Sequence, residues 1–334
     1  MAKKIKDTEY LAISTRIRAM ENGLLTRERM EQILEARTNE EAVKLLQDCG
    51  YPELDPTHPE SMDAALAAAR EATLADLADT APDPRYIDIF KLKYDYHNVK
   101  TILKADAVGT NPDHMLMDIG RVPAAELKEA VRRGDLGDLP PCLAEAAAEA
   151  KAVLDTTRDP QLSDIVLDRW CYLDMDGVAE ATGSDFLRGY VKAQIDAANL
   201  RSLIRTIRMG KNVDFLRGVL FTGGDIEADA VLKIRENGGN GLMEVYGPTP
   251  FRTAAEAGLE ALQGGTLTEF EKLCDDAVSD YLAGAQFVPF GEAPLLAYLA
   301  ARETEYTNLR ILLLGRSTGL SADVIRSRLR ASYV

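Results

Sequence analysis

A six-residue pattern, acid-x-x-Asn-apolar-basic, occurs three times in this chain of 334 residues. The copies are DYHNVK at 95–100, DAANLR at 196–201 and EYTNLR at 305–310, so successive copies begin 101 and 109 residues apart. That period has the length of a domain, whereas the units of short-repeat solenoids have about 20–45 residues. The chain should therefore contain three similar units, which we place at residues 1–108, 109–211 and 212–334.

Helical periodicity runs through almost the whole sequence, and strand signals are scarce. Ile87, Phe90 and Tyr94 form one apolar stripe at helical spacing. Thr38 followed by Glu41 is typical of a capping box at a helix start. The sequence predicts an all-α protein.

Each copy of the pattern is followed by a glycine-led turn and a further amphipathic segment. These turns begin at Gly120, Gly223 and Gly319. A degenerate copy of the same arrangement near the N-terminus has its turn at Gly23. We interpret residues 319–334 as a partial unit that closes the set.

Asparagine in the middle of a helix needs an explanation, because its helix propensity is poor. The acid three positions earlier lies on the same helical face and can join the same hydrogen-bond network. We expect these residues to form a buried polar clamp that fixes the helix against its neighbour in the same unit. One carboxylate and one amide per unit are too few for a metal site. The predicted clamp residues are Asp95, Asn98, Asp196, Asn199, Glu305 and Asn308.

Basic residues form a second feature of the same helices. Arg201, Arg205 and Arg208 fall within about 60° on a helical wheel. They could form salt bridges with the many acids on a solvated face, or they could form a basic strip that receives another protein. Both interpretations remain open from the sequence.

Charge and hydropathy exclude several classes of protein. The chain has 39 Lys and Arg against 54 Asp and Glu, a net charge of −15, which argues against nucleic acid as the main partner. We expect no membrane span, because no apolar run approaches the ~20 residues that a spanning helix needs. We also expect no secretory signal, and the four scattered cysteines fit reduced thiols in a cytoplasmic protein.

Catalytic signatures are missing from the sequence. It has no phosphate-binding G-x-x-x-x-G-K-[ST], no G-x-G-x-x-G and no His/Cys spacing for zinc. We therefore assign no catalytic, cofactor-binding or metal-binding residue. One alternative is an all-α, Mg²⁺-dependent prenyl-diphosphate enzyme, because Asp276 and Asp280 lie one turn apart, with Glu271 and Asp275 nearby. A second acidic helix, which such an enzyme needs, is not evident. A helical scaffold protein with some other partner is the remaining alternative.

Several segments together resemble one known family. They are 10–25 (YLAISTRIRAMENGLL), 88–100 (DIFKLKYDYHNVK) and 197–201 (AANLR), together with the three ordered copies of the repeat. With these segments, essentially the whole chain resembles the C subunit of bacterial and archaeal V/A-type ATP synthases, a relative of the eukaryotic vacuolar ATPase d subunit.

This resemblance implies an all-helical funnel of three similar units around a pseudo-threefold axis. It also implies a non-catalytic central-stalk subunit, a socket that couples the soluble rotor shaft to the membrane rotor ring during ATP-linked transport of protons or sodium ions. The expected partners are the shaft subunits of D and F type and the ring. The chain would then be a cytoplasmic subunit, peripheral to the membrane and monomeric within a hetero-oligomeric complex.

Overall fold

The computed structural model describes residues 5–334, and this part of the chain is helical without any β-strand. The all-α prediction is therefore confirmed. Three short 3₁₀ helices accompany the α-helices: η1 (Asp7–Tyr10), η2 (Asp113–Met115) and η3 (Gly284–Phe287). The α-helices in chain order are α1 (Leu11–Glu21), α2 (Arg27–Leu34), α3 (Asn39–Asp48), α4 (Pro59–Ala78), α5 (Arg85–Val108), α6 (Ala124–Arg133), α7 (Pro141–Thr157), α8 (Pro160–Thr182), α9 (Asp185–Arg208), α10 (Val213–Val219), α11 (Ala228–Glu236), α12 (Leu242–Tyr246), α13 (Arg252–Leu262), α14 (Leu267–Ala283), α15 (Glu292–Ser317) and α16 (Ala322–Arg326).

Packing divides the chain into two compact units. One contains Asp76–Val191, and the other contains Lys6–Ala75 together with Lys192–Val334. Helices α4 and α9 each pass from one compact unit into the other. This division does not test the division into three repeat units at 1–108, 109–211 and 212–334, which stays a prediction, as does the funnel about a pseudo-threefold axis.

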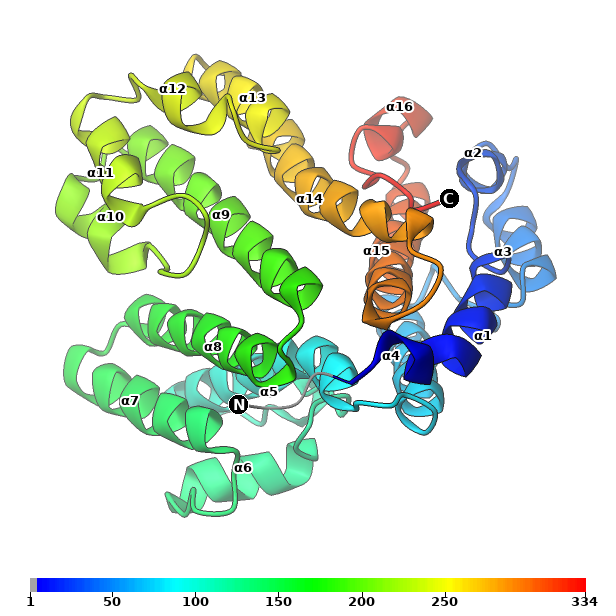
Figure 1. The fold of residues 1–334 in the computed structure, drawn as a ribbon, viewed down its shortest axis with the longest axis horizontal. Coiled ribbons are helices and arrows are strands. Elements are labelled where there is room, and N and C mark those ends of the chain that lie inside the picture. Colours follow the sequence, from blue (N-terminus) through cyan, green and yellow to red (C-terminus); the bar gives the residue numbers. More distant parts are fainter. Residues whose placement is uncertain (1–4) are drawn as a thin grey trace. The chain divides into compact units, whose positions relative to one another are not determined.

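The unit of Asp76–Val191 is built around α5. Helices α6 and α8 pack on α5, and α7 and α8 form an antiparallel pair (Figure 1). The stripe of Ile87, Phe90 and Tyr94 is buried, as its helical spacing predicts. One helix of 24 residues thus supplies the central element of this unit.

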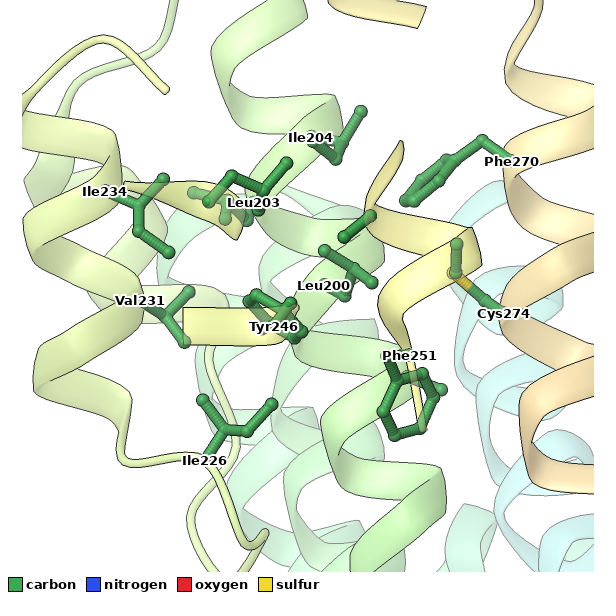
Figure 2. Packing of buried hydrophobic residues seen from close by; sticks show 14 of the residues in the cluster. Leu200, Leu203, Ile204, Ile226, Val231, Ile234, Tyr246, Phe251, Phe270 and Cys274 are labelled. Carbon is green, nitrogen blue, oxygen red and sulfur yellow. The ribbon is translucent and has the colours of Figure 1, made fainter. Parts of the chain in front are cut away.

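The larger unit has two separate hydrophobic clusters. In the first, Leu200, Leu203 and Ile204 of α9 lie between the apolar side chains of α11 and those of α14 (Figure 2). In the second, apolar residues of α2, α3 and α4 pack against Leu309, Leu312 and other residues of α15. The second cluster joins segments from both ends of the chain, because α2 begins at residue 27 and α15 ends at residue 317.

Local signals explain where several helices begin. The Thr38 hydroxyl accepts a hydrogen bond from the Glu41 N–H at 3.2 Å, so the predicted N-cap of α3 is confirmed. The Glu41 carboxylate accepts from the Arg37 N–H at 2.7 Å, one residue earlier than in the standard capping box. Among the four cysteines, which are all free, Cys274 is buried and the others are partly exposed.

None of the helices that the structure describes combines the length and the apolar character that crossing a membrane requires.

Candidate functional site: three asparagine clamps

The asparagine of each repeat holds one backbone residue with both ends of its amide. In the first repeat, Asn98 of α5 donates from Nδ2 to the carbonyl oxygen of Met117 at 2.8 Å, and its Oδ1 accepts from the Met117 N–H at 2.9 Å. Both bonds need a donor and an acceptor on one short, planar side chain, a combination that asparagine offers and leucine or aspartate does not. Asn98 is fully buried, so water cannot reach its amide group. The two hydrogen bonds to Met117 therefore satisfy polar atoms that would otherwise lack a partner.

The other two repeats make the same paired contact. Asn199 of α9 binds the backbone of Phe221 through two hydrogen bonds of 2.8 Å. Asn308 of α15 binds the backbone of Arg330 at 3.0 and 2.8 Å. The bound residue lies 19, 22 and 22 positions after its asparagine. We call each such pair of hydrogen bonds, together with the acid contact described next, a clamp.

The acid of each repeat binds the backbone just before another helix. Asp95 accepts from the N–H groups of Arg121 and Val122 at 2.9 and 3.2 Å. Asp196 accepts from those of Asp225 and Ile226 at 3.0 and 3.1 Å. The helices α6 and α11 begin two residues after Val122 and Ile226. A carboxylate is favoured there because the helix start has free N–H groups and the positive end of the helix dipole.

Glycine allows the loop to approach these two acids closely. A Cβ atom on Gly120 would lie 2.2 Å from Oδ1 of Asp95, and one on Gly224 would lie 2.1 Å from Oδ1 of Asp196. Both distances are far below van der Waals contact. The glycines of the first two turns are therefore required by the clamps that they contact.

The third clamp takes its acid contact from the other end of the chain. Glu305 of α15 accepts from the N–H of Leu25 at 2.5 Å, and α2 begins two residues after Leu25. The turn at Gly319 does lead into a helix, α16, as the sequence predicts, but the backbone that Glu305 binds is not in this turn. The equivalent segment follows Gly23, the turn that the sequence suggested was a separate, degenerate copy.

The three acids differ in how their charge is compensated. The Asp95 carboxylate pairs with Nε of Arg121 at 2.8 Å, and the same guanidinium reaches Asp174 at 2.6 Å. Glu305 contacts the Arg302 guanidinium and the Tyr51 hydroxyl. Among the described residues, no lysine or arginine forms an ion pair with Asp196. Burial accordingly raises the pKa of Asp196 to about 6, and its two backbone hydrogen bonds only partly oppose this rise.

The basic residue of each repeat forms a salt bridge with a second long helix. Lys100 of α5 pairs with Asp168 of α8 at 2.5 Å. Arg201 of α9 pairs with Asp275 of α14. Arg310 of α15 pairs with Asp63 of α4 at 2.7 Å. Each motif helix is therefore joined to its own partner helix by a salt bridge at the same position of the motif.

The structure places all three arginines of the basic strip in contacts within the chain. Arg201 and Arg205 pair with Asp275 and Glu271 of α14, the second pair at 2.6 Å. Arg208 donates to the carbonyl oxygen of Gly265 at 2.9 Å, just before α14. These contacts account for the arginines without a partner protein, and the partner role of Arg201, Arg205 and Arg208 stays a prediction.

Glu271, Asp275 and Asp276 of α14 have partners within the chain. Asp275 also accepts from Nε of Arg330 at 2.8 Å, and Asp276 accepts from the N–H of Ala331 at 2.8 Å. Across residues 5–334, no three His, Cys, Asp or Glu side chains are grouped so that they could hold a metal ion. The acidic residues of α14 thus secure α9 and the C-terminal segment, which is a structural use of the pattern that suggested Mg²⁺.

Comparison with known proteins finds similarity over nearly the whole chain. The family model described as ATP synthase (C/AC39) subunit matches residues 13–328. The C subunit of the V-type sodium ATPase of Enterococcus hirae is 26% identical over 326 residues, which cover 97% of this chain and 99% of the relative. The C subunit of the A-type ATP synthase of Methanocaldococcus jannaschii is also 26% identical and covers 96% of this chain and 86% of the relative. The corresponding A-type protein of Halobacterium salinarum is 26% identical, with coverage of 96% and 97%.

The family model and the relatives match nearly the whole sequence. The chain belongs to the ATP synthase (C/AC39) subunit family, whose members are non-catalytic subunits of V/A-type ATPases.

Proposed function

We propose that this subunit is the socket of the central stalk, which couples the soluble rotor shaft to the membrane rotor ring. The observation that carries the proposal is the family match over residues 13–328. The shaft subunits of D and F type and the ring would be its partners, in a complex that transports protons or sodium ions. The subunit would be cytoplasmic, peripheral to the membrane and present as one copy in a hetero-oligomer.

The clamps support this proposal because a part that transmits torque has to resist shear. Each motif helix is fixed to loop backbone at two points, which for α15 lie near opposite ends of the chain, and to a partner helix by a salt bridge. Close-packed interiors deform little under load, and the clamps add directional contacts that oppose sliding of helix against loop. We infer that the three repeats form a funnel about a pseudo-threefold axis and that both ends of the chain complete the third repeat.

The test is the recovery of the subunit with its partners. A tagged chain would be purified from detergent-solubilised native membranes, and co-purifying proteins would be identified by mass spectrometry. We expect shaft and ring subunits of a rotary ATPase. An unrelated acidic protein with the same tag is the control. Recovery of the chain alone, while intact ATPase is found elsewhere in the extract, would contradict the proposal.

A functional readout complements the recovery. Complexes reassembled without this subunit should retain ATP hydrolysis in the detached head, since the subunit is non-catalytic, but should lose ATP-driven ion transport. Restoration of transport by adding back the purified chain would support the coupling role, and full transport in its absence would refute it.

A further inference from the structure

The segment of residues 330–334 supplies one half of the third clamp and also binds three acids. Asn308 holds the Arg330 backbone through hydrogen bonds of 3.0 and 2.8 Å. Three donors of the segment each bind a carboxylate outside it. These contacts join Arg330 Nε to Asp275 at 2.8 Å, the Ala331 N–H to Asp276 at 2.8 Å and the Tyr333 hydroxyl to Glu21 at 3.1 Å. The segment therefore connects α15, α14 and α1.

The third clamp is split between two segments, unlike the first two. In each of the first two clamps, the residue held by the asparagine and the first residue held by the acid are four positions apart in one loop, at 117 and 121 and at 221 and 225. When one contact of such a loop breaks, the other keeps the loop nearby, and the broken contact re-forms readily. In the third clamp the acid holds Leu25, which is far from Arg330 in the sequence. The Asn308 contact can therefore open while the Glu305 contact stays closed.

The 330–334 segment also buries little of its surface. None of its side chains is buried, whereas the loops of the first two clamps bury Ile119 and Ile226, which are 4% and 9% exposed. Two gaps, of about 10 and 30 Å³, are each lined by Ser332 and Tyr333 together with Ala301 of α15. A segment with few buried apolar contacts opens locally at a low cost in free energy.

Each acid that the segment binds has a second, basic partner elsewhere in the chain. The pairs are Asp275 with Arg201, Asp276 with Lys272 at 3.0 Å and Glu21 with Arg18 at 2.7 Å. Release of the segment thus avoids the penalty of leaving a carboxylate without a counter-ion. The one ion pair that is lost joins Arg330 to Asp275, whose side chains are 23% and 38% exposed and so can be solvated.

We propose that residues 330–334 are a latch, which opens and closes on α14 and α15 while the Glu305 half of the third clamp and the rest of the fold stay intact. The ion pair between Arg330 and Asp275 holds the latch shut. The open state exposes the Asn308 amide to water. The third repeat then has two states where the first and second have one. This inference concerns the chain itself and does not depend on the proposed function.

Amide hydrogen exchange of the full-length chain, resolved at single residues, tests the inference without any mutation. The N–H groups of Met117, Phe221 and Arg330 are equivalent probes, because each donates to Oδ1 of its own clamp asparagine. We expect the protection factor of the Arg330 N–H to be about 100-fold lower than those of Met117 and Phe221, and insensitive to low concentrations of urea, as for local opening. The Leu25 N–H, which Glu305 binds, should keep the higher protection.

The variant Arg330→Gln tests the ion pair that holds the latch shut. It should lower the protection of the Ala331 N–H about tenfold further and leave Leu25 and Phe221 unchanged. Arg328→Gln is the matched control, because Arg328 is exposed and lies two residues before the latch. It should exchange as wild type does.

Three outcomes would overturn the inference. Protection of Arg330 equal to that of Phe221 would mean that the latch opens no more often than the other clamps. Protection of Leu25 as low as that of Arg330 would mean that the third clamp opens as a whole. An effect of Arg330→Gln no larger than that of Arg328→Gln would mean that the ion pair does not hold the segment.

Discussion

The first and second clamps share a backbone geometry but differ in their electrostatics. Asp95 and Asp196 each accept two N–H groups before a helix, and Asn98 and Asn199 each hold a backbone residue at both ends. Around Asp95, Arg121 and Asp174 form a buried ion network, and the Tyr96 hydroxyl donates to Asp174 at 3.1 Å. Around Asp196, the charged neighbours are Lys192 and Asp225, which pair with each other at 2.7 Å.

This difference separates what a clamp requires from what each site adds. The backbone contacts recur in all three repeats, so they define the clamp. Charge compensation differs from site to site: Arg121 and Asp174 accompany Asp95, Arg302 accompanies Glu305, and no basic side chain of the described residues forms an ion pair with Asp196, so these neighbours adjust the pKa and the stability of each site separately. Burial raises the pKa of both carboxyls, and the Arg121 guanidinium opposes that rise at Asp95. The two sites should therefore respond very differently to mutation and to pH.

Removal of the Arg121 side chain should give the largest effect. The side chain of Arg121 is 14% exposed, and those of Asp95 and Asp174 are 0% and 9% exposed. Arg121→Ala leaves two buried carboxylates without a counter-ion, a change that costs about 3–5 kcal/mol when one partner of a buried pair is lost. The free energy of unfolding, measured by urea titration at pH 7, should fall by that amount.

Arg132→Ala is the matched control for Arg121→Ala. Arg132 pairs with Asp106, and both side chains are 36% exposed, so solvent screens the pair. The control should unfold at nearly the wild-type urea concentration. Equal losses of unfolding free energy in the two variants would show that the ion network at the first clamp contributes no more to stability than an exposed ion pair does.

The second clamp should produce a pH dependence of stability. With an Asp196 pKa of about 6 when folded and an ordinary value of 3.8 when unfolded, the folded chain binds more protons than the unfolded chain between these values. Stability from this group is then fully present below pH 3.8 and is lost as the pH rises through 6. The total is about 3 kcal/mol, of which about 2 kcal/mol should appear between pH 7 and pH 4.5.

Comparison with Asp196→Asn isolates this contribution from all other titrating groups. The difference in unfolding free energy between wild type and Asp196→Asn should shift by about 2 kcal/mol in favour of wild type when the pH falls from 7 to 4.5. Asp95→Asn serves as a contrast, because it should destabilise the chain at pH 7 by removing the partner of Arg121. If the difference in unfolding free energy between wild type and Asp196→Asn did not change with pH, the effect of burial on the Asp196 carboxyl would be offset by its neighbours, and its pKa would not be raised.

Asn199→Leu tests the part of the clamp that all repeats share. Leucine has a similar volume but removes both hydrogen bonds to Phe221, which we expect to cost about 2 kcal/mol. Asn98→Leu should cost a similar amount, because the shared geometry does not involve Arg121. Asn240→Leu, at an exposed position, is the control. If Asn199→Leu left both stability and assembly of the complex unchanged, the clamp would have no role in fixing α9.

The sequence predicted the helices and the six clamp residues because both depend on local pattern. Helical periodicity identifies a buried face, and three asparagines in helix interiors need buried partners. The partners themselves were not predictable, because they are backbone groups, and every residue has those. Nothing in the identity of Leu25 distinguishes it as the contact of Glu305, which lies 280 residues away.

Side-chain partners of the clamps were also missed, although weak signals exist. Arg302 lies three residues before Glu305, a spacing at which helical side chains meet. Arg121 directly follows the glycine of the first turn, where the second turn has Asp225. That substitution marks the difference between the two sites, but its meaning depends on Asp174, which α8 brings close from a distant part of the sequence.

Mutation of the basic strip should have the smallest effect on stability. It also distinguishes the two interpretations of the strip, salt bridges within the chain or contact with another protein. Arg205 is the suitable position, because its side chain is 52% exposed and its partner Glu271 is 30% exposed. Arg205→Glu should change the free energy of unfolding little, since exposed pairs contribute little. If the strip contacts an acidic surface of the shaft, the variant should bind the purified head-and-shaft complex more weakly, with the loss greatest at low salt.

Arg205→Glu/Glu271→Arg restores the ion pair within the chain and keeps the net charge. A binding loss in the single variant that the double variant repairs would assign the strip to α14 alone, whereas unchanged binding in both would remove it from the interface.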